Sequence, residues 1–170
     1  MLNIERIVQK IIDNNKPFFD LSSYVAVYPV KNLQELDIII NNYIEEFGNN
    51  CELNWIDVSQ ITDMQCLFSD SKFNGDISKW DVSNVTNMVG MFTHSDFNGN
   101  ISNWDVSNVT NMTNMFSYSL FDNNISNWDV SNVKKMASMF QHTGFNQDIS
   151  NWDVSNVTDM SWMFAGSKFN

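Results

Sequence analysis

A column of carboxylates is the first feature of the sequence that could do chemistry. Aspartate returns every 24 positions, as Asp57, Asp81, Asp105, Asp129 and Asp153. If successive copies stack at the spacing of strands in a sheet, these carboxylates lie about 5 Å apart, which is unfavourable unless something compensates the repulsion. Two interpretations stay open. Each Asp could accept structural hydrogen bonds from neighbouring Ser hydroxyls or backbone amides. Alternatively, the five could form an acidic stripe that faces a basic protein patch or cations.

A second column carries imidazoles and a phenol. Asp70, His94, Tyr118, His142 and Gly166 occupy equivalent positions in a segment that we expect to be a return loop. The two histidines are two copies apart, roughly 10 Å at the sheet spacing, which is too far to share a metal ion bound at about 2 Å. We therefore expect no metal site. His94, Tyr118 and His142 are either simply solvated or contact a partner, since aromatic side chains on loops are favoured interface anchors.

Nothing in the sequence indicates catalysis or a cofactor. It contains no nucleophile elbow, phosphate-binding loop, zinc-binding helix motif or Gly-rich dinucleotide turn. The many acids recur with the repeat, whereas an active site is a single constellation. The two cysteines, Cys51 and Cys66, are too few for a disulfide framework and lack metal-ligand spacing, so we expect reduced core cysteines. The sequence thus predicts a protein that is not an enzyme.

Charge and hydropathy exclude two classes of partner. The chain has 9 basic and 20 acidic residues, for a net charge of -11, whereas nucleic-acid sites need clustered Lys and Arg. No stretch approaches the roughly 20 apolar residues of a membrane span. We therefore expect a protein partner, without nucleic-acid binding and without membrane insertion.

An internal repeat of 24 residues positions both columns. Its apolar and aromatic members recur in register: Phe73, Phe97, Phe121, Phe145; Trp80, Trp104, Trp128, Trp152; Met64, Met88, Met112, Met136, Met160. Residues 57–170 are 114 residues, and 114/24 is 4.75 copies. A period of this length is the signature of a solenoid, in which stacked copies bury what one copy alone cannot. The recurring Phe and Trp side chains are therefore expected to stack from copy to copy as a ladder in the core.

Each copy is interpreted as a short strand, a helical turn and a return loop. The apolar spacing of Ile77, Trp80, Val82 and Val85 has the form of a leucine-rich-repeat strand and its flank. Trp80 and Val82 alternate about Asp81 and so share one face of a strand. From Val85 onward, the apolar residues step by three and four, as on one face of a helix. We therefore predict a leucine-rich-repeat-like solenoid with a parallel sheet.

Residues 1–56 have a different pattern and are expected to cap the array with a helix, a strand and a helix. Apolar spacing predicts the first helix over 4–12 and a β-branched run predicts the strand over 24–30. Asn32 and Glu35 form a capping box for the second helix, and Gly48 ends it. The predicted buried stripe of this helix is Leu33, Leu36, Ile40, Tyr43, Ile44 and Phe47.

The last copy would present apolar side chains and an open edge to solvent. We predict self-association through Trp162, Met163, Phe164 and Phe169, giving an end-to-end homodimer; the alternative is that the chain is shortened here.

The run Phe73-Asn-Gly-Asp-Ile-Ser-Lys-Trp-Asp-Val-Ser-Asn-Val-Thr-Asn-Met88 and its copies resemble the BspA-like leucine-rich-repeat surface proteins of bacteria, over about residues 52–170. The stretch from Leu33 to Met64 also resembles the lead-in to such arrays. The resemblance implies a repeat solenoid that binds proteins, typically at the cell surface in adhesion, without enzymatic activity.

Two functions remain open from the sequence. The first is a non-catalytic protein-protein interaction module, adhesin-like or scaffold-like, that binds through the solenoid surface. The alternative is an acidic intracellular inhibitor that blocks a basic, nucleic-acid-binding type of site on a target protein. The resemblance implies a location at the cell surface. The residues themselves predict a cytoplasmic chain, because the first ten lack the basic region and apolar core of a secretory signal and the sequence shows no anchor.

Overall fold

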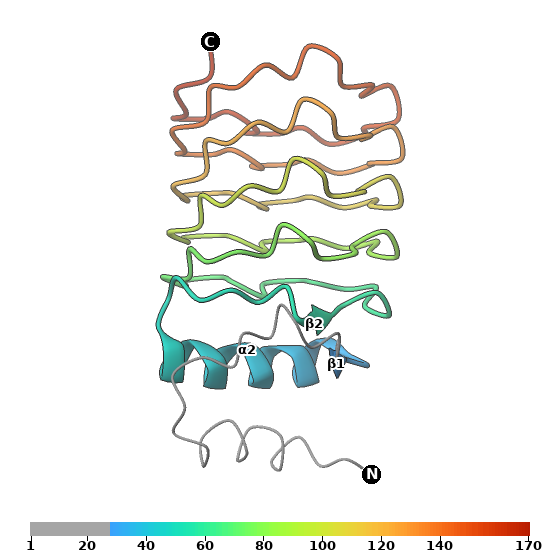
Figure 1. The fold of residues 1–170 in the computed structure, drawn as a ribbon. Coiled ribbons are helices and arrows are strands. Elements are labelled where there is room, and N and C mark those ends of the chain that lie inside the picture. Colours follow the sequence, from blue (N-terminus) through green and yellow to red (C-terminus); the bar gives the residue numbers. More distant parts are fainter. Residues whose placement is uncertain (1–27) are drawn as a thin grey trace.

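The computed structural model describes residues 28–170, in which a short capping region is followed by a stack of coils (Figure 1). The capping region contains strand β1 (Tyr28–Pro29) and helix α2 (Leu33–Phe47), and strand β2 (Ile56–Asp57) begins the first coil. β1 and β2 pair in parallel, with Tyr28 opposite Ile56. The helix predicted over 4–12 lies outside the described residues.

The caps predicted for α2 are confirmed. The Asn32 side chain accepts a hydrogen bond from the Glu35 backbone N–H at 2.9 Å, which satisfies one of the free amides at the helix start. The Glu35 carboxylate accepts in turn from the Lys31 backbone N–H, also at 2.9 Å. At the other end, the Gly48 N–H donates to the Ile44 carbonyl. Gly48 has a φ of 84°, a backbone conformation that favours glycine.

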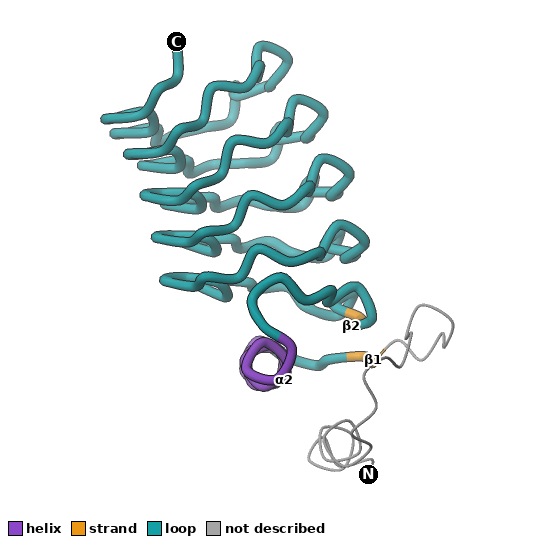
Figure 2. The backbone as a smooth tube through the Cα atoms, turned by 60° about the vertical axis from the view of Figure 1, so that its left-hand side comes forward, coloured by secondary structure: helices purple, strands orange, loops and turns teal. Residues whose placement is uncertain are grey.

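Helix α2 covers the end of the core below the first coil (Figures 1 and 2). Leu36, Ile39 and Ile40 are buried in the same cluster as Leu53 of the first coil. Phe47 was expected in the buried stripe, and this expectation is wrong, since 47% of Phe47 is exposed. Phe47 is the last residue of α2, and its ring contacts the Tyr43 ring of the same helix at 4.4 Å between centroids.

Successive coils are joined at equivalent positions. Isolated parallel bridges link the residue before each Met of the repeat to its counterpart one coil on. These residues are Asp63, Asn87, Asn111, Lys135 and Asp159. The rest of each coil is turns and irregular backbone, as the teal tube of Figure 2 shows. The repeat of 24 residues is therefore one full coil of backbone.

The local structure of a coil differs from the predicted strand and helical turn. Trp80 and Val82 lie between two tight turns and form no strand ladder. In the first turn the Trp80 N–H donates to the Ile77 carbonyl at 3.2 Å. In the second the Val85 N–H donates to the Val82 carbonyl at 2.9 Å. Beyond them, overlapping turns replace the helical turn. Gly90 and His94, four positions apart, have positive φ, of 60° and 53°, and left-handed residues interrupt an α-helix.

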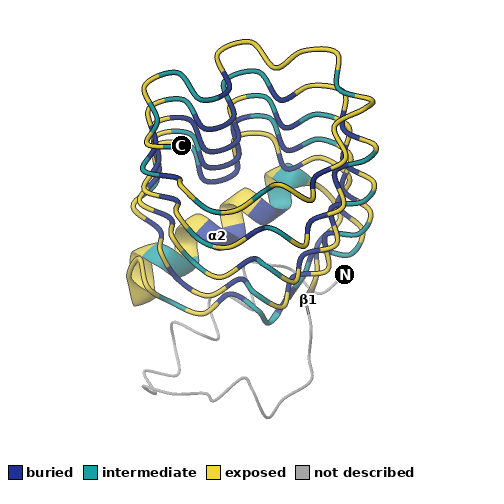
Figure 3. Cartoon of the chain, turned by 90° about the horizontal axis from the view of Figure 1, so that it is seen from above, coloured by how far each residue is buried: buried dark blue, intermediate teal, exposed yellow. Residues whose placement is uncertain are grey.

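The core is a set of aromatic columns along the stack, as the repeat spacing predicts. Phe92 and Phe116 stack at 5.6 Å between centroids with an interplanar angle of 1°, and Trp80 and Trp104 at 6.4 Å with 5°. The Trp104 indole N–H donates to the Ile77 carbonyl of the preceding coil at 3.2 Å, so the ring is both packed and hydrogen-bonded. Buried residues therefore line the inside of the coils and exposed ones the outside (Figure 3).

Candidate binding surfaces

The Asp column is tied into the backbone by a local turn. In one copy, the Asp81 carboxylate accepts hydrogen bonds from the Ser83 backbone N–H at 3.1 Å and from its hydroxyl at 2.6 Å. The same backbone contact joins Asp57 to Ser59, Asp105 to Ser107, Asp129 to Ser131 and Asp153 to Ser155. These contacts support the structural interpretation of the column, in which each Asp closes a turn.

These hydrogen bonds favour the ionised carboxylates. The Ser131 hydroxyl and N–H lower the pKa of Asp129 below its ordinary value, and the Ser155 N–H and hydroxyl do the same to the pKa of Asp153. The neighbouring Asp129 carboxylate acts in the opposite direction on the pKa of Asp153, as expected for adjacent like charges, but the hydrogen bonds outweigh it and the pKa stays lowered. The side chains of Asp81, Asp105, Asp129 and Asp153 are exposed. The column is therefore a negatively charged stripe as well as a series of turns.

A neighbouring column shows that the turn does not need a charge. The Asn100 side-chain oxygen accepts from the Ser102 N–H at 3.1 Å and from its hydroxyl at 2.8 Å, and Asn124 accepts from the Ser126 N–H at 2.9 Å. An amide thus performs the same structural role as a carboxylate. The uniform carboxylates of the Asp column provide charge beyond what the turn requires.

The second predicted column forms a stack of exposed rings, which we name the aromatic ridge: His94, Tyr118 and His142. The Tyr118 ring lies 4.7 Å from His94 and 4.6 Å from His142 between centroids, with interplanar angles of 10° and 28°. Tyr118 is 47% exposed, and Leu120, two residues further on, is 63% exposed. The structure therefore brings these three predicted site residues together.

All three ridge residues have left-handed backbone, with φ of 53°, 57° and 53°. Asp70 precedes them in the column and Gly166 follows, with φ of 56° and 67°. A Cβ at Gly166 would collide with the His142 ring, which therefore lies directly against the glycine backbone. The ridge ends there because the next position of the column, Gly166, carries no side chain.

The described residues contain no group of three or more His, Cys, Asp or Glu side chains placed to hold a metal ion. The Tyr118 ring separates the two histidines of the ridge.

Both cysteines are free. Burial raises the pKa of the half-buried Cys51 thiol to about 11, whereas Cys66 is exposed, so the expectation of a core cysteine is wrong at Cys66. Its Sγ faces Gly90, the equivalent residue one coil on, which has no side chain to cover it.

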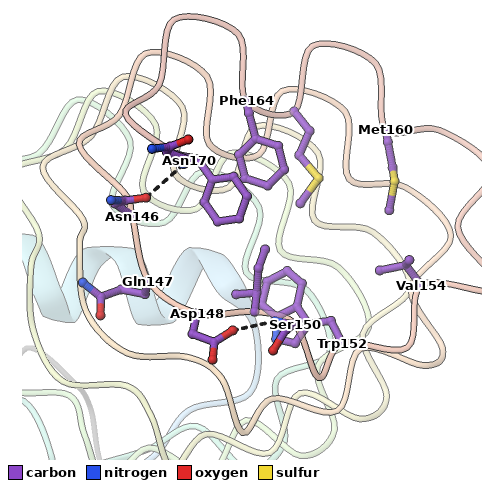
Figure 4. A pocket seen from close by; sticks show the side chains of 12 residues that line it. Asn146, Gln147, Asp148, Ser150, Trp152, Val154, Met160, Phe164 and Asn170 are labelled. Atoms are coloured by element: carbon purple, nitrogen blue, oxygen red, sulfur yellow. Dashed lines mark hydrogen bonds between the residues drawn. The ribbon is translucent and has the colours of Figure 1, made fainter.

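The last coil surrounds a hollow of about 610 Å³ (Figure 4), whose apolar lining includes Trp152, Phe164 and Phe169. The rings of Phe164 and Phe169 are half-buried and stack at 4.2 Å. Of the residues predicted for self-association, Trp162 is 73% exposed, whereas Met163 is 6% exposed and lines the hollow together with Phe164 and Phe169. The hollow was not foreseen from the sequence, because it depends on how the last coil closes.

A chain of stacked 24-residue coils with exposed charged and aromatic columns is a repeat protein, and the family comparison agrees. The model of a family described as "Mycoplasma protein of unknown function, DUF285" matches residues 34–142 and 94–170. The chain belongs to this family, which includes BspA-like repeat proteins. No curated protein and no solved structure matches the chain significantly. Among the described residues, no helix has the length and apolar character needed to cross a bilayer.

Proposed function

We propose that this protein is a non-catalytic protein-binding module whose aromatic ridge contacts the partner. The observation that carries the proposal is the stack of exposed rings on left-handed backbone. A left-handed residue other than glycine costs about 1–2 kcal/mol, and a bulky Tyr118 at φ of 57° gains none of the relief that Asn or Asp finds there. The same left-handed backbone recurs in the coils outside the ridge, as at Cys66 and Trp162, so it is a property of the turn, and at the ridge it fixes the direction of each exposed ring.

The ridge has the properties of a preorganised contact surface. Each ring is held by stacking on its neighbour, so binding costs little further side-chain entropy. Aromatic side chains dominate the energetics of many interfaces, and tyrosine combines apolar area with a hydrogen-bonding hydroxyl. An adhesive or scaffolding role at the cell surface follows from the resemblance to BspA-like proteins and is part of this proposal.

A second candidate function is supported by the Asp column. Because Asn100 and Asn124 close the same turn without charge, the carboxylates are free to act as a stripe that attracts a basic protein. This candidate corresponds to an acidic inhibitor of a basic, nucleic-acid-binding type of site. Its binding would weaken strongly with salt, whereas binding through the ridge would not.

The two candidates are separated by capture experiments with proteins from the native cell. The immobilised chain would be compared with Tyr118→Gly and with the double variant Asp105→Asn, Asp129→Asn, at about 0.1 M and 1 M salt, where the screening length is about 10 Å and 3 Å. We expect Tyr118→Gly to lose the captured partner at both salt concentrations. Asp70→Gly, a change in the same column outside the ridge, is the matched control and should retain it.

Loss of capture with the Asn variant and at high salt, together with normal capture by Tyr118→Gly, would support the acidic stripe and refute the ridge. Capture that neither variant reduces would refute both.

A further inference from the structure

The backbone of each coil donates a row of hydrogen bonds to the next coil. Four alternate residues take part, and their N–H groups all point toward the carboxyl-terminal end of the stack. In the fourth coil the pairs are Met136 to Asp159 at 2.8 Å, Ser138 to Ser161 at 2.8 Å, Phe140 to Met163 at 2.9 Å and His142 to Ala165 at 2.8 Å. The accepting carbonyls correspondingly point back toward the preceding coil.

The equivalent N–H groups of the last coil have no hydrogen-bond partner among residues 28–170. They belong to Met160, Trp162, Phe164 and Gly166, and we name them the terminal donor row. Backbone donors normally find a partner, and an open row of them is a template for pairing with another chain. Trp162 and Gly166 have positive φ, of 59° and 67°, as in the inner coils, so the row already has the geometry that pairs elsewhere in the stack.

Acceptors on the same face also lack the donors that a further coil would supply, although the Ile149 carbonyl keeps its turn hydrogen bond from the Trp152 N–H at 3.1 Å. The Ile125 carbonyl receives the Trp152 indole N–H at 3.2 Å, and the Lys134 carbonyl receives the Thr158 N–H at 2.9 Å. The corresponding carbonyls one coil on, those of Ile149 and Thr158, receive no such donor among the described residues.

The apolar part of the face is also unfilled. Phe140 and Phe145 are each covered by the ring one coil on, Phe164 at 5.7 Å and Phe169 at 6.2 Å. Phe164 and Phe169 themselves line the open hollow of Figure 4. Donors, acceptors and rings on this face therefore repeat the arrangement that binds one coil to the next.

We propose that this end face binds one further coil, supplied by a polypeptide that carries the same 24-residue repeat. A second copy of this chain does not fit the face. Two end faces brought together would present no matching row of carbonyls, because those carbonyls already accept bonds from the preceding coil. The opposite end of a second copy is covered by α2 (Figures 1 and 2). The face therefore selects a repeat-bearing segment over the predicted end-to-end homodimer.

The probe is a synthetic peptide of residues 145–170, the segment that covers the equivalent face of the preceding coil. Amide hydrogen exchange of the isotope-labelled protein is followed by NMR as unlabelled peptide is added. At a peptide concentration ten times Kd, we expect exchange at Met160, Trp162, Phe164 and Gly166 to slow about tenfold. A scrambled peptide of the same composition should slow none of them.

Two variants keep the proposal falsifiable. Phe164→Lys places a charge in the hollow and should abolish the protection, whereas Trp162→Asn changes only an exposed side chain of the same coil and should retain it. Unchanged slow exchange at Met136 and Ser138 would show that the fourth coil of each variant is folded.

No saturable effect of the peptide, or binding that leaves the terminal donor row unprotected, would overturn the proposal. So would protection that develops with protein concentration alone, since it would indicate self-association. The proposal is independent of the ridge, because Tyr118→Gly should bind the peptide normally.

Discussion

Substitution of Tyr118 separates two opposing contributions to stability. Tyr118 stacks on His94 and His142, and it does so with φ of 57°. Tyr118→Ala removes the stacking but keeps a Cβ, which makes left-handed backbone sterically unfavourable. Tyr118→Gly removes the stacking and the backbone strain together. Comparison of the two variants therefore isolates the strain.

The magnitudes follow from the contacts. An aromatic pair contributes about 0.5–1.5 kcal/mol, and the half-exposed ridge places two pairs near the low end, about 1 kcal/mol in total. Glycine recovers about 1–2 kcal/mol of left-handed strain and loses about 0.4–1 kcal/mol through the greater freedom of its unfolded chain. We expect Tyr118→Ala to be destabilised by about 1 kcal/mol and Tyr118→Gly to be about 0.5–1 kcal/mol more stable than Tyr118→Ala.

The assay is equilibrium unfolding in urea, with the free energy of unfolding extrapolated to water. Lys79 supplies the matched control, because it is exposed and its φ is not positive. At Lys79 the order should reverse, with the Gly variant less stable than the Ala variant by about 0.5–1 kcal/mol. A Tyr118→Ala variant as stable as Tyr118→Gly, or more so, would refute the assignment of strain to the ridge.

Two further predictions concern the core and the Asp column. Trp104→Phe removes the indole hydrogen bond to the Ile77 carbonyl and leaves a small void, so unfolding in urea should show a loss of about 2 kcal/mol; an unchanged midpoint would contradict a structural role for the indole N–H. Because folding lowers the pKa of Asp129, the ionised carboxylate stabilises the folded chain at pH values above its ordinary pKa of 3.8. This stabilisation is lost as the pH falls below 3.8 toward the pKa of the folded state. Melting temperatures should therefore drop below about pH 4, less steeply in Asp129→Asn; an equally steep drop in that variant would contradict the assignment.

Much of the packing could be predicted from the sequence, because strict repetition determines which side chains stack regardless of backbone detail. The Trp104 and Phe116 columns are buried as the spacing requires. The start of α2 at Asn32 was equally predictable, since an N-cap is a local arrangement of one side chain and one N–H. Phe47 could not be placed in this way, because its burial depends on where the first coil ends.

The backbone of the coil was harder to predict because two structures share one apolar spacing. Overlapping turns bring Val85, Met88 and Phe92 to one side of the chain, as a helix would. Gly90 and its equivalent Asn114 tolerate positive φ, but Cys66, Ser138 and Trp162 stand in the same column, so residue type gives only a weak signal of the left-handed position. The terminal donor row has no sequence signal of its own, since it consists of backbone groups.

One backbone arrangement produces both the ridge and the terminal donor row. The turns of Gly90 to Thr93 and Met88 to Met91 satisfy every second peptide group within the coil. The remaining peptide groups are turned along the stack, and the left-handed residue at position 94 of the chain directs its ring outward at the same point. The same alternation of peptide groups within the coil thus underlies both the exposed column and the terminal donor row.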